Sequence, residues 1–578
     1  MYDLIIRGGL VVDGSGSEPR TADVAVNGGR IAAVGDLSEP ALRTLDADGL
    51  IVTPGFVDIH THYDAQATWD PHLTPSGWHG VTTAICGNCG VGFAPARPDE
   101  HEFLIGLMEG VEDIPGAALS AGIRWDWETF PEYLDALERA PKAIDIAAQV
   151  PHGPVRSYVM GQRGADNEPA TAEDIAAMAE IVREGIEAGA LGFSTSRTII
   201  HKAINGEPVP GTFATEDELF GIGRALGATG KGVFELAGAG TAGEDIVGPK
   251  LEMDWMRRLS AEIGRPISFA MLQVDSAPDL WRELLTLSEE ANAEGAQIYP
   301  QVAGRPFGLL IGFQTDFNMF AEKPTYKALL DLPFEERIER LRDPEVRRKI
   351  LSEEVTIEDP MAAFVFSAFH KVFKLGSPPN YEPLESESVS AMAAAAGVEP
   401  AALLYDWMLE EDGKQLLFFP LLNYSNGSCD PIYEMIQHPQ AVLGLGDGGA
   451  HCGVICDASI QTFMLTHWVR DRTRGERLPL EFVIRRMTHD TAKLYGLNDR
   501  GLIAPGMKAD LNLIDMKTLG LELPKMAFDL PAGARRLLQK ATGYVATIVS
   551  GEVVMLGGEP TEARPGRLVR GPQSPLQA

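Results

Sequence analysis

The stretch Gly55-Phe56-Val57-Asp58-Ile59-His60-Thr61-His62 indicates the fold most strongly. Its apolar residues predict a strand, and alternate side chains of a strand lie on one face, so His60 and His62 can reach the same ion. A chance His-x-His pair is the alternative. The turn Gly87-Asn88-Cys89-Gly90, which follows the next apolar run, adds a cysteine. Two imidazoles and a thiolate are ligands that zinc prefers, so we predict a metal site.

Composition narrows the class of protein. The chain has 578 residues, of which 45% are hydrophobic, enough for a large core. Asp and Glu number 82 against 49 Lys and Arg, a net charge of −33 that argues against nucleic-acid or membrane partners. The first residues contain no basic leader, and no apolar stretch reaches eighteen residues, so we expect a soluble cytoplasmic protein. It could form a homo-oligomer. Five cysteines argue against a disulfide framework.

The two ends of the chain share a β-rich texture. Short apolar runs separated by turns such as Asp13-Gly14 and Asn27-Gly28-Gly29 predict hairpins near the amino terminus. Similar runs return at 509–515 and 544–554. We therefore predict a small β-sandwich domain built from residues 1–52 and 505–578.

Between the ends, strand-like runs alternate with helical patterns, which is typical of an α/β protein with a (β/α)8 TIM-type barrel. We place this barrel at 53–504, with a mostly helical insertion at about 303–441. A helix is predicted at 172–188 from its apolar spacing, and an amphipathic one at 334–341. The predicted barrel strands are 56–62, 82–86, 144–150, 192–196, 232–236, 267–272, 297–302 and 442–446.

Chemistry in such a barrel lies where strands end and loops begin. Asp447 is the most useful of these residues, because a carboxylate there can bind a metal and accept a proton from water. Candidate substrate-binding residues at other strand ends or in adjoining loops are His152, Arg197, His201, Arg305 and His451. For His152 and His451, hydrogen bonding that only shapes a loop is the alternative. Either arginine could clamp a substrate carboxylate.

These motifs resemble the amidohydrolase superfamily, and within it the N-acyl-D-amino-acid deacylase (D-aminoacylase) branch. The resemblance rests on the first motif, the cysteine turn, Ser194-Thr195-Ser196, Asp447 and the segment 501–510. The cysteine turn is its specific part. The resemblance implies zinc and hydrolysis of the amide bond of an N-acylated compound. It also implies that the metal ligands are His60, His62, Cys89 and Asp447.

The resemblance also implies one histidine at the end of the fifth strand and one at the end of the sixth, but this chain has none between His201 and His370. Three interpretations follow. In the first, the four remaining ligands hold a single zinc ion. In the second, Glu235, His201 or His451 replaces a missing histidine and a second ion binds. In the third, the protein keeps the fold but has lost catalysis. For Glu235, an ion pair with an arginine is the alternative.

We therefore expect a metal-dependent hydrolase in which a bound ion activates water and Asp447 acts as general base. A lysine usual after the sixth strand is replaced here by the stretch 270–273, which indicates a less charged pocket and a hydrophobic or aromatic N-acyl substrate. Aromatic residues of the insertion could line that pocket or form core instead. A cyclic amide or ester substrate on the same centre is the alternative.

Overall fold

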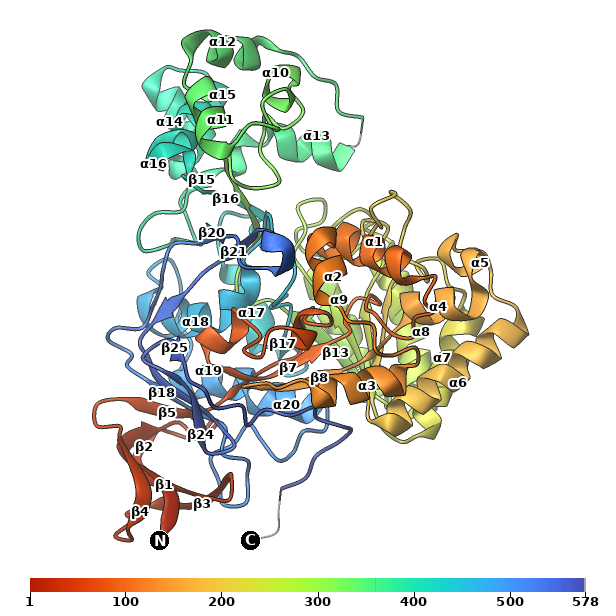
Figure 1. The fold of residues 1–578 in the computed structure, drawn as a ribbon, viewed down its shortest axis with the longest axis vertical. Helices are drawn as coiled ribbons and strands as arrows, with labels where there is room; N and C mark the ends of the chain where they lie inside the picture. Colours follow the sequence, from red (N-terminus) through yellow and green to blue (C-terminus); the bar gives the residue numbers. More distant parts are fainter. Residues whose placement is uncertain (359, 576–578) are drawn as a thin grey trace.

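Parallel strands form the centre of the computed structural model, which describes residues 1–358 and 360–575 (Figure 1). One parallel sheet has three strands and another has six. The three-stranded sheet contains β6 (Phe56–Asp58), β7 (Val81–Cys86) and β8 (Asp145–Ala148). The six-stranded sheet contains, in order, β9 (Val150–Pro151), β10 (Gly192–Ser196), β11 (Val233–Ala237), β12 (Ile267–Ala270), β13 (Ile298–Val302) and β17 (Val442–Leu443). Each predicted strand overlaps at least one of these observed strands, and the predicted strand 144–150 corresponds to β8 and the start of β9.

Hydrogen bonds link the two parallel sheets at both edges. After β6, Thr61 pairs in parallel with Gly448, and the amide of His62 donates to the Gly448 carbonyl over 2.8 Å. At the other edge, the Leu191 amide before β10 donates to the Ala148 carbonyl of β8 over 2.9 Å. The carboxyl ends of β6 and β17 are therefore neighbours.

Helices follow the strands along the chain and cover them on the outside (Figure 1). The earlier ones are α1 (His101–Glu112), α2 (Gly116–Gly122), α3 (Phe130–Arg139), α4 (His152–Met160), α5 (Gln162–Ala165), α6 (Ala172–Ala188), α7 (Glu216–Ala228), α8 (Gly248–Ile263) and α9 (Leu280–Ala293). The later ones are α17 (Asp430–Gln437), α18 (Ile460–Phe463), α19 (Leu480–Met487) and α20 (His489–Leu494). None of the helices in the described ranges combines the length and apolarity that crossing a bilayer requires.

Helix α6 shows how the sequence sets these elements. Thr171 and Asp174 form a reciprocal capping box, in which each side chain accepts a hydrogen bond from the other's backbone amide. Met178, Val182 and Ile186 then bury one face at helical spacing. The predicted helix at 172–188 is confirmed.

Strands from both ends of the chain form one nine-stranded sheet. Its centre is the antiparallel pairing of β5 with β18, in which Val52 lies opposite Leu513. The prediction that the two ends build one β unit is confirmed. The amino-terminal strands are β1 (Tyr2–Val11), β2 (Arg20–Asn27), β3 (Arg30–Gly35), β4 (Ala41–Asp46) and β5 (Ile51–Pro54). The carboxyl-terminal strands are β18 (Leu511–Ile514), β23 (Tyr544–Val549), β24 (Glu552–Leu556) and β25 (Glu559–Pro560).

Two parts of the carboxyl-terminal region lie outside that sheet. The strand pairs β19 (Gly520–Leu521) with β22 (Ala541–Thr542) and β20 (Lys525–Ala527) with β21 (Arg536–Leu538) form an arm. This arm extends toward the insertion (Figure 1). After β25, Leu568 pairs with Ile146 of β8, and the Val569 amide donates to the Ile146 carbonyl over 2.8 Å. The segment after β25 therefore pairs with β8 of the three-stranded parallel sheet.

The region between β13 and β17 carries most of its elements in a lobe at the top of Figure 1. Phe419, Tyr405 and Leu341 are fully buried in a core of its own, and Phe418 is buried in the main core. The predicted helix at 334–341 is α11. The elements of the lobe are β14 (Phe307–Ile311), α10 (Pro324–Lys327), α11 (Phe334–Leu341), α12 (Pro344–Ser352), α13 (Pro360–Ser367), β15 (Phe373–Lys374), α14 (Val389–Ala396), α15 (Pro400–Met408), α16 (Glu410–Gly413) and β16 (Leu417–Leu422).

Candidate metal centre

Four side chains meet at the carboxyl ends of the parallel strands. His60 and His62 follow β6, Cys89 follows β7 and Asp447 follows β17. The Sγ of Cys89 lies 3.3 Å from Nε2 of His60. Oδ1 of Asp447 lies 3.5 Å from that same Nε2 and 3.7 Å from Nε2 of His62. All four residues are buried, so their donor atoms face one another rather than bulk water.

Strained backbone presents two of these side chains. Cys89 has φ +55° and Asp447 has φ +41°, in the left-handed region that residues with a Cβ rarely adopt. Beside Cys89, a Cβ on Gly90 would lie 2.8 Å from the Ser196 amide nitrogen, so only glycine fits there. Asn88 fixes the turn by donating to the carbonyls of Thr61 and Ile85.

Residues behind the cluster orient His60 and Cys89. Nδ1 of His60 lies 3.0 Å from Oε1 of Gln301 on β13, so Nδ1 donates and the lone pair of Nε2 faces Cys89. Oε2 of Glu235 on β11 accepts from the Cys89 amide over 3.1 Å, and its Oε1 lies 3.8 Å from Nδ1 of His60. The structure therefore gives Glu235 these partners rather than an arginine.

Glu112, at the end of α1, is a residue that the sequence did not indicate. Its Oε2 lies 3.4 Å from Nε2 of His62 and 3.7 Å from Nε2 of His451, while its Oε1 is buried without a partner. No motif marks Glu112, because its position depends on how α1 packs over the strand ends. Gln301 lies next to the last residue of the predicted strand 297–302, so a search of strand ends for polar residues could have found it.

Imidazole and carboxylate groups of the cluster lie close together and shift one another's pKa values. Burial disfavours the imidazolium of His62, but Glu112 and Asp447 outweigh it and raise the pKa of His62 to about 9. Burial also disfavours the Asp447 carboxylate, but His62, His60 and His451 outweigh it and lower its pKa to about 2. Burial lowers the pKa of His60 to about 4. Without a metal, His62 and Asp447 thus form the charged pair.

The donor set fits a divalent ion of the zinc type. Zinc bonds of about 2.0–2.3 Å in tetrahedral geometry place ligand atoms about 3.3–3.6 Å apart, close to the separations observed here. Oε1 of Glu112 and Oε1 of Glu235, beside the cluster, are buried without hydrogen-bond partners, which indicates that the protein alone does not satisfy the site. His60, His62 and Cys89 form a group whose donor atoms lie within 4.8 Å of one another.

Three other predicted site residues are held by protein partners. Nδ1 of His152 lies 2.8 Å from the Thr195 hydroxyl, and its Nε2 lies 3.0 Å from Glu218. The guanidinium of Arg197 donates to Glu252 and to two backbone carbonyls. That of Arg305 donates to Asp457, to Ser459 and to a carbonyl. Their roles in substrate binding stay predictions.

His201 and His451 lie closer to the cluster. Nδ1 of His201 is 3.0 Å from the Ser196 hydroxyl, and burial together with the charges of His451 and His62 lowers its pKa to about 3. Nε2 of His451 is 3.8 Å from Oδ2 of Asp447. The structure therefore brings these two histidines toward the metal-ligand candidates, unlike His152.

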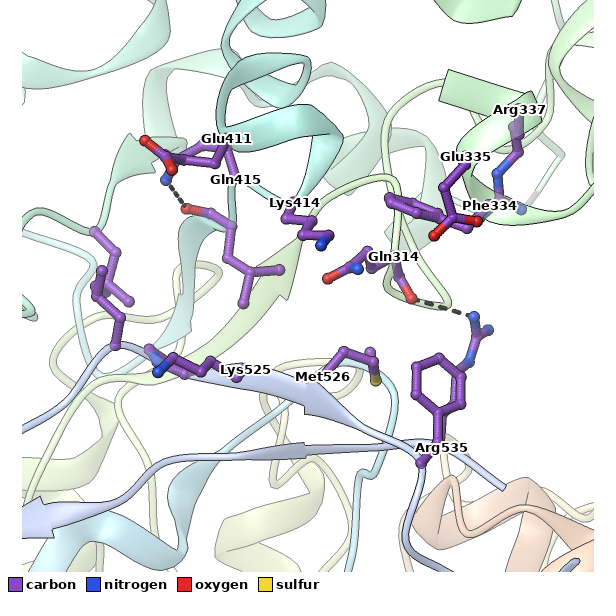
Figure 2. Close-up of a pocket in the computed structure, with 15 residues that line it drawn as sticks. Gln314, Phe334, Glu335, Arg337, Glu411, Lys414, Gln415, Lys525, Met526 and Arg535 are labelled. Atoms are coloured by element: carbon purple, nitrogen blue, oxygen red, sulfur yellow. Dashed lines mark hydrogen bonds between the residues drawn. The ribbon is translucent and has the colours of Figure 1, made fainter. Parts of the chain in front are cut away.

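A cavity of about 830 Å³ lies away from the cluster (Figure 2). It is lined by the insertion and the β20–β21 arm, where Arg535 reaches toward Gln314 and donates to its carbonyl. None of the cluster residues lines it. A cavity beside Asp447 holds about 20 Å³, room for a single water.

Known proteins are similar to this chain in sequence and in fold. Residues 43–555 match the amidohydrolase family. A D-aminoacylase from Alcaligenes xylosoxydans xylosoxydans is 30% identical over 90% of this chain and 89% of its own length. A D-aminoacylase structure covers 99% of this chain and 100% of its own at 24% identity and a TM-score of 0.64. That of the N-acyl-D-glutamate deacylase from Bordetella bronchiseptica covers 98% and 99% at 23% identity and a TM-score of 0.64.

The chain therefore belongs to the amidohydrolase family. Within that family it lies in the D-aminoacylase-like branch, whose members hydrolyse carbon–nitrogen bonds other than peptide bonds. The similar D-aminoacylase is described as having a binuclear metal centre with one-metal activation and second-metal attenuation. The similar glutamate deacylase is complexed with zinc and a phosphonate mimic of the tetrahedral intermediate.

Proposed function

We propose that this protein is a metal-dependent hydrolase that cleaves the amide bond of an N-acyl compound. The convergence of His60, His62 and Cys89 on Oδ1 of Asp447 carries the proposal. These residues would hold one zinc ion, since neither β11 nor β12 supplies the two histidines that a second site of the usual kind needs. One-metal activation of the similar D-aminoacylase supports a single active ion.

A bound divalent ion would polarise a carbonyl and lower the pKa of water toward neutrality. Asp447 would orient the attacking water, accept its proton and pass that proton to the leaving nitrogen, which otherwise departs as a poor amide anion. His451, whose Nε2 lies 3.8 Å from Oδ2 of Asp447, would donate to the oxyanion or to the substrate. His201, whose pKa the charges of His451 and His62 help to lower, is a second candidate for this role. Gln301 would keep Nε2 of His60 turned to the site.

The substrate we propose carries no carboxylate beside its amide. The two strand-end arginines that could clamp one, Arg197 and Arg305, are each paired with a protein carboxylate. Glu112 and Glu235 stand beside the cluster, and burial raises the pKa of Glu112 to about 7 and that of Glu235 to about 8, so neither offers a positive charge to a substrate carboxylate. A neutral N-acyl compound, such as a hydrophobic or aromatic amide, fits this balance of charge better than a free N-acyl amino acid.

We also propose the finer architecture. The hydrogen bonds that link both edges of the parallel sheets support one (β/α)8 barrel within 53–504, with the insertion at about 303–441. Side chains of the amino-terminal and carboxyl-terminal strands of the terminal sheet, among them Ile6 and Ile548, share one core. This shared core supports a sandwich made from 1–52 and 505–578. The tail beside β8 would then be an extension of that domain.

Metal content and hydrolysis together test the function. Cys89→Ser should lower the bound zinc of the purified protein and its activity, whereas Cys429→Ser, at another buried cysteine, should change neither. Asp447→Asn should lower kcat by about 100- to 10,000-fold, the usual contribution of a general base.

A screen of N-acyl amino acids of both hands, aryl amides, lactams and esters would identify the bond that the enzyme hydrolyses. A protein inactive on all of these with zinc or manganese added would refute the proposal, and turnover of lactams or esters alone would favour those substrates.

A further inference from the structure

The cavity of about 830 Å³ between the lobe and the arm has no role in the chemistry proposed above (Figure 2). Its volume lies in the range of about 300–1,000 Å³ that small-molecule sites usually have. One wall comes from the lobe and the other from the arm. The chemistry of these walls indicates which class of ligand fits.

Apolar side chains form much of both walls. Leu375 and Leu416 come from the lobe and are buried, whereas Leu523, Met526 and Phe528 come from the arm. Phe528 is 67% exposed and Leu523 is 42% exposed. Two large apolar side chains that stay exposed beside one cavity leave apolar surface that a ligand would gain free energy by covering.

Cationic side chains reach the same cavity. Lys414 extends from the lobe into the space between the walls, and Lys525 lies on β20 on the opposite side (Figure 2). Within the described part of the chain, neither ammonium forms an ion pair with a carboxylate. A third cation, Arg337, is buried, and its Nη2 donates to the Phe313 carbonyl over 2.9 Å, but its Nε has no hydrogen-bond partner. The protein therefore leaves cationic groups at this cavity without counterions.

The lining carries more positive than negative charge. Glu335 and Glu411 are its two carboxylates. The fourth cation of the lining, Arg535, forms an ion pair with Asp316 and is offset by it. Three cations thus remain against two carboxylates, in a chain whose net charge is −33. A ligand with one negative charge would balance this local excess.

Hydrogen bonds hold the two walls in place. The guanidinium of Arg535 in the arm donates to the carbonyl of Gln314 in the lobe over 3.1 Å. Both walls are also bonded to the loop after β17, because the amides of Leu537 in the arm and Asp316 in the lobe donate to two adjacent carbonyls of that loop, over 2.6 and 3.2 Å. The cavity is therefore formed before a ligand arrives, which lowers the cost of binding.

We propose that this cavity binds a small organic acid that carries an apolar chain. The ammonium groups of Lys414 and Lys525 would pair with its carboxylate, while Leu523, Met526 and Phe528 would cover its chain. The carboxylic acid released from an N-acyl compound belongs to this class, and only that link rests on the proposed function. Binding itself needs no metal, because none of the proposed zinc ligands lines the cavity.

Three probes separate the contribution of charge from that of apolar contact. Octanoate has both, 1-octanol has the chain without the charge, and acetate has the charge with almost no chain. Isothermal titration calorimetry should show one equivalent of octanoate bound. The affinity for 1-octanol should be about threefold lower or more, the contribution of two exposed ion pairs, and acetate should bind still more weakly. No binding of octanoate, or equal affinity for octanoate and either of the other probes, would overturn the proposal.

Variants of the two walls locate the bound acid. Lys414→Met and Lys525→Met should each weaken octanoate binding about two- to fivefold, the usual range for an exposed ion pair. Lys231→Met, at an exposed lysine elsewhere, is the matched control and should bind like the wild type. Leu523→Ser should also weaken binding, whereas Leu556→Ser, at a leucine of β24 that is 54% exposed, should not.

One further variant separates this inference from the proposed function. Cys89→Ser removes a proposed zinc ligand and should bind octanoate like the wild type. Binding that is lost in Cys89→Ser but unchanged in both lysine variants would place the acid at the metal centre, overturning the cavity site and leaving the proposed function intact. Binding that depends on Lys414 and Lys525 in a protein without hydrolytic activity would support the cavity site and refute the proposed function alone. Thermal unfolding of each variant would confirm that it is folded.

Discussion

Gln301 of β13 holds His60, which follows β6, through a single contact of 3.0 Å between Oε1 and Nδ1. The contact crosses from one parallel sheet to the other and determines which ring nitrogen of His60 faces Cys89. The contact of Gln301 with the cluster is made by its Oε1, and its Nε2 is buried without a hydrogen-bond partner. It is therefore a positioning residue.

Replacing Gln301 should weaken metal binding without removing a ligand. Gln301→Leu is expected to raise the zinc Kd about 10- to 100-fold, because His60 loses the partner that fixes its tautomer. Competition with a chelating dye would measure the Kd. Gln301→Glu retains an acceptor oxygen at this position and should restore much of the affinity. Equal losses in the Leu and Glu variants would contradict this role.

Asp145 should contribute strongly to stability. Its carboxylate is fully buried, accepts from Arg500 over 2.7 Å and lies 3.0 Å from the ammonium of Lys508. Asp145→Asn would leave two buried cations without this partner, which typically costs about 3–5 kcal/mol. Urea unfolding at pH 7 would measure the loss. Glu552→Gln removes an exposed ion pair with Arg43 and should cost under about 1 kcal/mol.

The same carboxylate predicts how stability changes with pH. Burial opposes ionisation of Asp145, but Lys508 and Arg500 outweigh it and lower its pKa to about 2. Because the folded-state pKa lies below the unfolded value of about 3.9, this contribution is present above pH 3.9 and is lost as the pH falls toward 2. Melting temperatures between pH 6 and 2 should fall less steeply in Asp145→Asn than in the wild type. Parallel curves would refute the assignment.

Gly90 should be intolerant of a side chain. A Cβ there would meet the Ser196 nitrogen at 2.8 Å and the Thr195 Cα at 2.9 Å. Gly90→Ala should therefore displace the Cys89 turn, lowering both zinc content and melting temperature. Gly397→Ala has nearly the same φ, +68° against +69°, but meets nothing within 4 Å. The control should lose only about 1–2 kcal/mol from backbone strain and keep its zinc.

Substrate charge should decide the rate. If the site offers no positive charge to a substrate carboxylate, an N-acyl amino acid amide should be hydrolysed with a kcat/KM at least about tenfold above that of the corresponding free acid, since a difference of about 1.4 kcal/mol suffices. Matched pairs of both hands would be compared. A preference for the free acid would refute the neutral-substrate proposal and would indicate that a cationic side chain reaches the pocket.

The sequence predicted elements whose pattern is local. The strands around His60 and Cys89 and the helix 172–188 follow from alternation, capping and apolar spacing, and all three are present. The environment of the cluster was harder to predict. Glu112 depends on how α1 packs over the strand ends, and the protein partners of Arg197 and Arg305 come from distant segments, 55 and 152 residues away. A single sequence does not encode such contacts in a readable pattern.

The pairing of β5 with β18 has a consequence for synthesis of the protein. These adjacent strands are separated by about 460 residues of chain. At roughly 5–20 residues per second, the ribosome would need about 20–90 seconds to supply β18 after β5. During that interval β5 would present an unpaired edge to other nascent chains. A chaperone that shields this strand would therefore be expected to raise the yield of folded protein more than one acting after release.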